Sequence, residues 1–137
     1  MVELTETFAL RCEELDKDHK RLIEMVNEIN EYIDKNKTSR CINKVTEFVN
    51  FAKEHFDREE KFLKKNSYPD IASHHEHHKK LIAKMEHIQE FASSAETSEL
   101  ARVSLKRELV YLLMDDLITT DLDFKDFIKK GQTCGEL

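Results

Sequence analysis

The sequence contains very few residues that interrupt helices. Its 137 residues include two glycines, Gly131 and Gly135, and one proline, Pro69. Glycine and proline are the strongest signals for turns and breaks. Their scarcity before residue 131 excludes a turn-rich fold and predicts long, uninterrupted helices with short connections.

Long apolar runs and an excess of positive charge are also missing. No apolar run reaches the roughly 18 residues that a membrane-spanning helix needs. The N-terminus MVELTETFALR carries two glutamates where a secretory signal would need positive charge and then an apolar core. Lys and Arg number 22 against 28 Asp and Glu, and the interspersed charges form no basic patch for a phosphate backbone. We therefore expect a soluble, cytoplasmic protein that binds neither nucleic acid nor a membrane.

The three cysteines offer no site of their own. Cys12, Cys41 and Cys134 are odd in number, widely spaced and not arranged as a CxxC pair. We expect reduced structural or surface thiols that are not metal ligands.

Apolar residues recur at the three- and four-residue spacing of amphipathic helices. The chain length suits one domain, so we expect residues 1–137 to form a single all-α domain. The expected segments are an N-terminal arm (1–14), helices over about 16–35, 39–65, 70–93 and 97–129, and a loose tail (131–137). Side chains that can cap the four helices are Asp16 or Asp18, Thr38 or Ser39, Asp70, and Thr97 or Ser98. Short connections favour an up-down-up-down four-helix bundle.

Histidines and one glutamate lie in phase with these apolar stripes. His55 and Glu59 are four residues apart, as are His74 and His78, and a four-residue step keeps two side chains on one helix face within about 6 Å along the axis. His19 shares the stripe of the first helix. A lone histidine on such a stripe is more often a core residue than a ligand, but a buried carboxylate is costly unless it is paired or bound to a cation. The position of Glu59 on the buried stripe therefore favours a metal site over a set of core histidines.

Several polar residues beside these positions have a different expected place. Periodicity puts His75 and His77 on the flanks of the third helix, and we expect them and His87 to be solvated. Glu60 is out of phase with its stripe, which predicts a solvated or supporting group. Asp115, Asp116 and Asp121 lie in or beside the leucine-rich stripe of the last helix. Four or more imidazole and carboxylate ligands that converge in a bundle favour a two-metal site, for which iron, zinc and manganese are all suitable.

Four sequence stretches together resemble the hemerythrin family, the non-haem di-iron oxygen-binding bundles, and the bacterial hemerythrins in particular. These stretches are LDKDHKRL around His19, HFDREEKF with His55 and Glu59, YPDIASHHEHH with His74 and His78, and DLITTD before Phe124. The resemblance extends from about Leu15 to Phe127. It implies a hemerythrin-like bundle that holds two oxo- or hydroxo-bridged iron ions and takes dioxygen or a related small ligand.

The resemblance also implies a role for each site residue. Glu59 and Asp121 would bridge the two irons. His74 and His78 would bind one iron, while His19 and His55 would bind the other, which keeps an open position for oxygen. The residues expected to form the dry apolar pocket around the oxygen position are Leu22, Ile23, Phe56 and Leu113.

One position departs from the family pattern. Asp116 stands where the family has a third histidine on the first iron, and Leu112 stands where a tryptophan is common. Asp116 can bind the metal directly, bind through water, or not bind at all, and Asp115 can contend for the place. If Asp116 binds, its added negative charge favours the ferric state and makes manganese more acceptable.

These expectations leave three functional hypotheses. The first is a di-iron protein that binds or senses dioxygen. The second is a di-iron redox enzyme whose substrate is peroxide, nitric oxide or ferrous iron. The third is an iron or redox sensor whose fold tightens when metal binds, and which would need a separate protein partner that the sequence does not identify.

Overall fold

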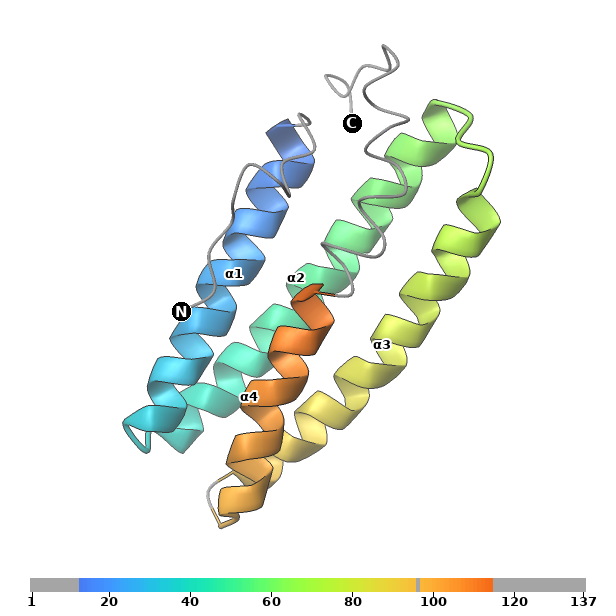
Figure 1. Ribbon diagram of the computed structural model, residues 1–137. Helices are drawn as coiled ribbons and strands as arrows, with labels where there is room; N and C mark the ends of the chain where they lie inside the picture. Colours follow the sequence, from blue (N-terminus) through green and yellow to red (C-terminus); the bar gives the residue numbers. More distant parts are fainter. Residues whose placement is uncertain (1–12, 96, 115–137) are drawn as a thin grey trace.

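A computed structural model describes residues 13–95 and 97–114 of the protein. Within these residues, four antiparallel helices pack as a bundle. The helices are α1 (Glu13–Asp34), α2 (Thr38–Lys65), α3 (Ile71–Ser94) and α4 (Glu99–Met114). Each helix packs against the next along the chain, and α4 returns to pack against α1 (Figure 1). The predicted all-α, up-down-up-down four-helix bundle is thereby confirmed.

The helix boundaries differ slightly from those expected. α1 begins at Glu13 rather than at 16, so the last two residues of the predicted arm 1–14 are helical. The other described boundaries lie within two residues of the predicted ones. The rest of the arm, the predicted helix end at 129 and the tail 131–137 lie outside the described residues.

The predicted helix caps are confirmed at one helix only. Ser98 caps α4, because its Oγ accepts a hydrogen bond from the backbone N–H of Ala101 at 3.1 Å. Asp70 precedes α3 as expected, yet its side chain makes no capping hydrogen bond. Thr38 is the first residue of α2, which follows Lys37 without a side-chain cap. Asp16 and Asp18 lie inside α1 and are not caps.

Two helix ends turn without glycine. Asn36 after α1 and Ser67 after α2 adopt left-handed backbone conformations, with φ of 56° and 55°. At each end the following N–H reaches back five residues, from Lys37 to the Tyr32 carbonyl at 2.8 Å and from Tyr68 to that of Leu63 at 2.9 Å. These bonds satisfy carbonyls that a helix end would otherwise leave open. The chain can therefore reverse direction tightly although glycine is absent here.

The core follows the predicted apolar stripes. In the second helix the three- and four-residue spacing predicts a buried stripe, and all its members are buried, namely Val45, Phe48, Val49, Ala52, His55, Phe56, Glu59, Phe62 and Leu63. In α3 the same spacing predicts a stripe of which Ile71 and Ile82 are half-buried and the others are buried, namely His74, His78, Leu81, Met85, Ile88 and Ala92. Cys41 is a free thiol buried in the core, and burial raises its pKa. The remaining cysteines and the stripe residues beyond Met114 lie outside the described residues.

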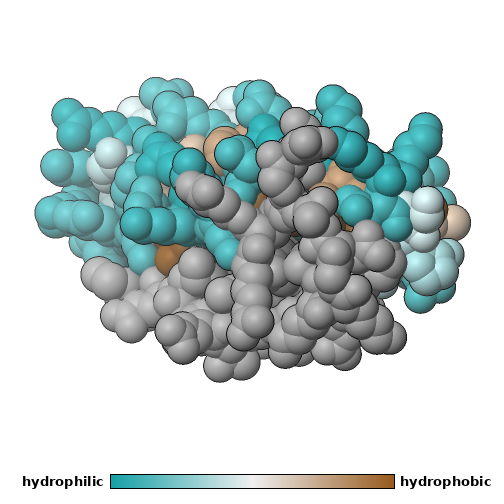
Figure 2. Space-filling model, turned by 90° about the horizontal axis from the view of Figure 1, so that it is seen from above, coloured by the Kyte–Doolittle hydropathy of each residue, from teal (hydrophilic) through white to brown (hydrophobic). Residues whose placement is uncertain are grey.

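In the view from above in Figure 2, the visible surface of the described residues is mostly hydrophilic. Within residues 13–95 and 97–114, every helix is too short or too polar to span a lipid bilayer.

Two leucines on α4 test how much the buried core contributes to the stability of the bundle. Leu105 is 0% exposed and Leu100 is 75% exposed, although they lie little more than one turn apart. We expect Leu105→Ala to lower the free energy of unfolding by about 2–5 kcal/mol, because it removes buried apolar contacts and leaves a cavity. Leu100→Ala should change it by less than about 0.5 kcal/mol. Urea denaturation measures both, and equal effects would contradict this view of the core.

Candidate metal centre

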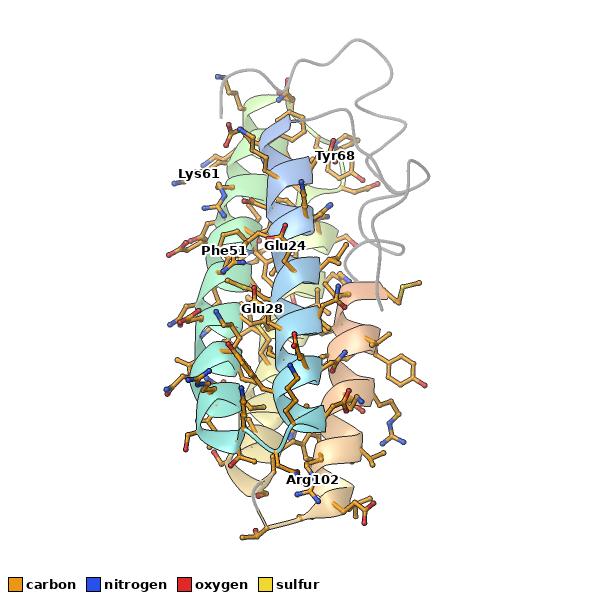
Figure 3. All side chains as sticks on the ribbon, turned by 90° about the vertical axis from the view of Figure 1, so that its left-hand side faces the viewer. Glu24, Glu28, Phe51, Lys61, Tyr68 and Arg102 are labelled. Carbon is orange, nitrogen blue, oxygen red and sulfur yellow. The ribbon has the colours of Figure 1, made fainter. Side chains whose placement is uncertain are left out.

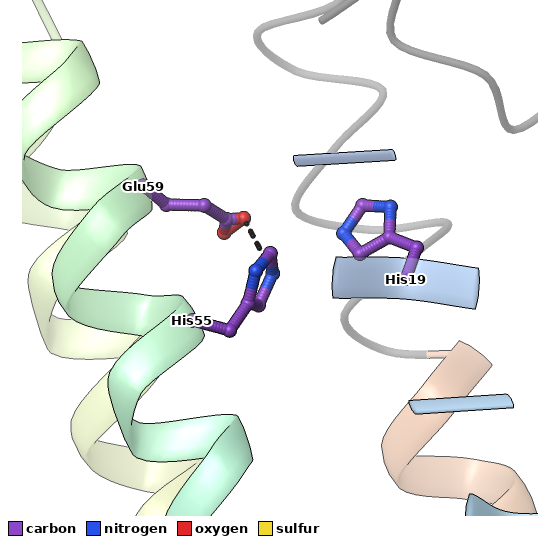
Figure 4. Close-up of side chains that lie close together, drawn as sticks. All are labelled: His19, His55 and Glu59. Atoms are coloured by element: carbon purple, nitrogen blue, oxygen red, sulfur yellow. Dashed lines mark ion pairs between the residues drawn. The ribbon is translucent and has the colours of Figure 1, made fainter. Parts of the chain in front are cut away.

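Five polar side chains lie buried inside the apolar core. His19 comes from α1, His55 and Glu59 from α2, and His74 and His78 from α3, and all five are buried. One turn of helix separates the two members of each pair on α2 and α3, so each pair points the same way. Figure 4 shows His19 facing His55 and Glu59 across the space between α1 and α2. The structure thus brings together five of the seven predicted site residues.

Glu59 is the carboxylate that the histidines share. Its Oε2 lies 3.1 Å from His55 Nε2, and its Oε1 lies 3.4 Å from His74 Nε2 and 3.3 Å from His78 Nε2. Two groups of three, each with its ligand atoms within 4.8 Å of one another, therefore overlap at Glu59. They are His19, His55 and Glu59, and Glu59, His74 and His78.

Outside this cluster, Asp18 orients His55. The Oδ2 atom of Asp18 lies 2.8 Å from His55 Nδ1. Arg58 donates two hydrogen bonds to the same carboxylate, from Nε at 2.8 Å and Nη2 at 2.9 Å. Burial by itself would raise the pKa of Asp18, but the hydrogen bonds with His55 and Arg58 lower it below its ordinary value. Asp18 is therefore an ionised acceptor, and His55 must donate from Nδ1.

Glu60 has the corresponding position beside His78. Its Oε1 lies 3.2 Å from His78 Nδ1 and 2.7 Å from Nδ1 of His75 on the bundle surface. Carboxylates that accept from the outer nitrogen of a histidine are the usual support for metal-binding imidazoles, because they fix the tautomer and the ring orientation. Phe56 adds to this support by stacking on the His78 ring, with centroids 4.1 Å apart.

The protonation of these histidines shows whether the cluster fits a metal. When Nδ1 of His55 or His78 donates outward, Nε2 of the neutral ring carries a lone pair that faces an oxygen of Glu59. Two acceptors about 3 Å apart inside a core repel each other unless a second proton on the ring or a cation lies between them. The single charge of Glu59 can balance one imidazolium but not two. The cluster is therefore suited to a cation.

Glu59 itself supplies negative charge to this cation site. Burial by itself would raise its pKa, but positive charge on His55 and hydrogen bonds donated by His55, His74 and His78 hold that pKa well below the ordinary value. A cation among the same nitrogens acts on the carboxylate in the same direction. Imidazole nitrogen and carboxylate oxygen together suit iron, zinc and manganese. The residues present thus form His/Glu groups that can hold a metal ion.

Comparison with known proteins agrees with this chemistry. Residues 12–121 match the family model described as the hemerythrin HHE cation binding domain. The chain belongs to this hemerythrin family. It is also 29% identical over 77 residues to the myohemerythrin of Theromyzon tessulatum, a match that covers 56% of this chain and 59% of that protein's length. The chain therefore aligns with little more than half of that myohemerythrin.

The hemerythrin bundle places the other predicted residues as follows. Leu22, Ile23, Phe56 and Leu113 are buried in the core as expected. His75 and His87 are exposed as expected, but His77 is half-buried. Asp115, Asp116 and Asp121 lie outside the described residues, so their place at the metal centre stays a prediction.

The interpretation of the sequence missed the contact between Asp18, Arg58 and His55. The sequence indicated Asp18 only as a possible helix cap. For Arg58 it offered nothing beyond a position three residues after His55. That spacing puts Arg58 on a flank of the buried stripe, facing a neighbouring helix. Only the packing of α1 against α2 shows that Asp18 lies opposite.

The Asp18 support can be tested by removing its charge. We expect Asp18→Asn to weaken Fe(II) binding by about 10–100-fold, because the amide holds His55 less firmly and presents an N–H to Arg58. A matched control is Asp34→Asn at the other end of α1, where Asp34 pairs with Lys106 at the surface. Anaerobic titration against a competing chelator measures the affinities. Equal affinities in both variants would show that Asp18 does not support the site.

Proposed function

We propose that this protein is a di-iron hemerythrin of the bacterial type that binds or senses dioxygen. The observation that carries the proposal is the buried Glu59 carboxylate, which lies between one histidine pair from α1 and α2 and another from α3. A carboxylate shared by two sets of imidazoles is the arrangement expected of a bridging ligand in a two-metal bundle. Membership of the hemerythrin family supports iron as the metal.

We assign the ligands in two halves that share Glu59. His19 and His55 serve one ion, and His74 and His78 serve the other. We further propose, from the sequence alone, that Asp121 is a second bridge and that Asp116 serves the same ion as His74 and His78. Manganese in place of one iron fits the same donor set.

The protein's own residues prepare this site for a small ligand. Two ferrous ions held by these residues would supply the two electrons with which dioxygen can be bound reversibly. Asp18 and Glu60 keep protons on the outer nitrogens of His55 and His78, so the inner nitrogens are available to metal. Leu22, Ile23 and Phe56 are buried in the core and exclude water around the site.

The visible spectrum of the iron-loaded protein tests the proposal. We expect two irons per chain and, after air is admitted to the reduced protein, a charge-transfer band that fades when oxygen is removed. Glu59→Gln is the control, because surface histidines such as His75 and His87 can collect iron without Glu59. A band that survives in Glu59→Gln would locate the chemistry elsewhere. Direct conversion to a stable ferric spectrum would favour a redox enzyme or a redox sensor over an oxygen-binding protein.

The proposed ligand Asp116 gives a separate prediction. A carboxylate in place of histidine adds negative charge beside the irons and stabilises the ferric state. We therefore expect Asp116→His to raise the ferric/ferrous midpoint potential. The matched control is Asp115→His at the neighbouring position, which should leave the potential unchanged. A rise in the Asp115 variant alone would assign the ligand to Asp115, and no rise in either would remove both from the site.

A further inference from the structure

A surface groove lies directly outside one half of the metal centre. It runs between α2 and α3, has a volume of about 410 Å³, and is lined by Asp57, Glu60, Ile71 and His75 among others. The His75 side chain is 52% exposed and the Glu60 side chain 23% exposed. Water therefore reaches two good metal ligands at this place.

Three short contacts connect the groove to the centre. His75 Nδ1 lies 2.7 Å from Glu60 Oε1, and the same oxygen lies 3.2 Å from His78 Nδ1. On the other side of its ring, His78 Nε2 lies 3.3 Å from Glu59 Oε1. A continuous row of imidazole and carboxylate groups thus leads from solvent to the buried carboxylate.

The other half of the centre is closed in the corresponding place. The Asp18 side chain behind His55 is only 10% exposed and is held by two hydrogen bonds from Arg58. The Arg58 guanidinium in turn lies 5.4 Å from the centre of the Phe51 ring, and Figure 3 labels Phe51 on α2. Access on this side would require two charge-assisted hydrogen bonds to break, which is costly. The two halves therefore differ in how easily their ligands can exchange.

We propose that Glu60 and His75 form the port through which metal enters and leaves the His74 and His78 half of the centre. The inference rests on the proposed function as a metal-binding protein. His75 and Glu60 take up a divalent cation from water first, and His78 and Glu59 then replace them as ligands. The His78 ring faces Glu60 with Nδ1 and Glu59 with Nε2, so the second exchange requires this ring to turn aside while Glu60 still holds the ion.

Charge in the groove does not explain uptake. Lys61 and Lys64 line the groove together with Asp57 and Glu60, so the lining charges offset one another. Lys61 lies on the outer side of α2 (Figure 3). The lining therefore adds little local attraction for a cation, and uptake at this place depends on ligation by His75 and Glu60.

His75→Gln is the decisive variant, because it removes an exposed imidazole and leaves Glu60 beside His78. The experiment measures anaerobic uptake of Fe(II) by the apo protein, release of iron to a coloured Fe(II) chelator, and final iron content. We expect both uptake and release to slow by about tenfold, with the iron content per chain and the visible spectrum unchanged, because a port lowers the barrier in both directions. The matched control is His87→Gln, another exposed histidine of α3, which pairs with Glu90. Its rates should equal those of the wild type.

Each other outcome has a definite meaning. Unchanged rates in His75→Gln would overturn the port. The proposed function would still stand, because the wild-type protein would load iron normally. Loss of iron content in His75→Gln would show that His75 is a permanent ligand, which also overturns the port. Equal slowing in His87→Gln would attribute uptake to the histidine-rich surface in general. A wild-type protein that takes up no iron would overturn the proposed function and the port together.

Discussion

A negative charge lies in the middle of this bundle, and the surrounding structure is arranged to hold it. Glu59 is fully buried, and ionised carboxylates are rarely found in a core unless cations or hydrogen-bond donors surround them. The Nε2 atoms of His55 on α2 and of His74 and His78 on α3 lie 3.1–3.4 Å from its oxygens. Because two of those imidazoles donate outward to other carboxylates, they leave lone pairs directed at Glu59. Such a cluster is suited to a cation, which agrees with membership of the hemerythrin HHE cation binding family.

The two sides of the cluster are supported in different ways. On the α1 side, Asp18 is ionised, nearly buried and paired with Arg58, so His55 is held in one orientation. On the α3 side, Glu60 divides one oxygen between His78 and the exposed His75. His55 is held firmly because its acceptor, Asp18, is paired with Arg58. His78 can exchange metal more easily because its acceptor, Glu60, is shared with the solvated His75. This difference gives a single bundle one fixed half and one accessible half.

The turn between α2 and α3 determines how Glu59 meets His74 and His78. Ser67 adopts a left-handed conformation, and the Tyr68 N–H reaches back to the Leu63 carbonyl, so the chain reverses within a few residues. Tyr68 is itself buried and packs edge-on against the His74 ring, with centroids 6.5 Å apart. The same short reversal places Glu60 of α2 beside His75 of α3. A longer connection would leave the register of the two helices less well defined.

The sequence by itself determined which side chains face inward. Among four crowded histidines, the 3.6-residue period selected His74 and His78, because the face of a helix on which a residue lies depends on local geometry alone. The period also placed Glu59 in the core and Glu60 outside its stripe. Helix caps were predicted less well, since Asp, Ser and Thr occur near every boundary and, of the candidates within the described residues, Ser98 is the one with a capping bond to the helix backbone. Tertiary structure alone decided the partners of Asp18, Arg58 and Glu60. These residues lie on the flanks of their helices, where periodicity predicts a polar residue but the packing of another helix determines which group lies opposite.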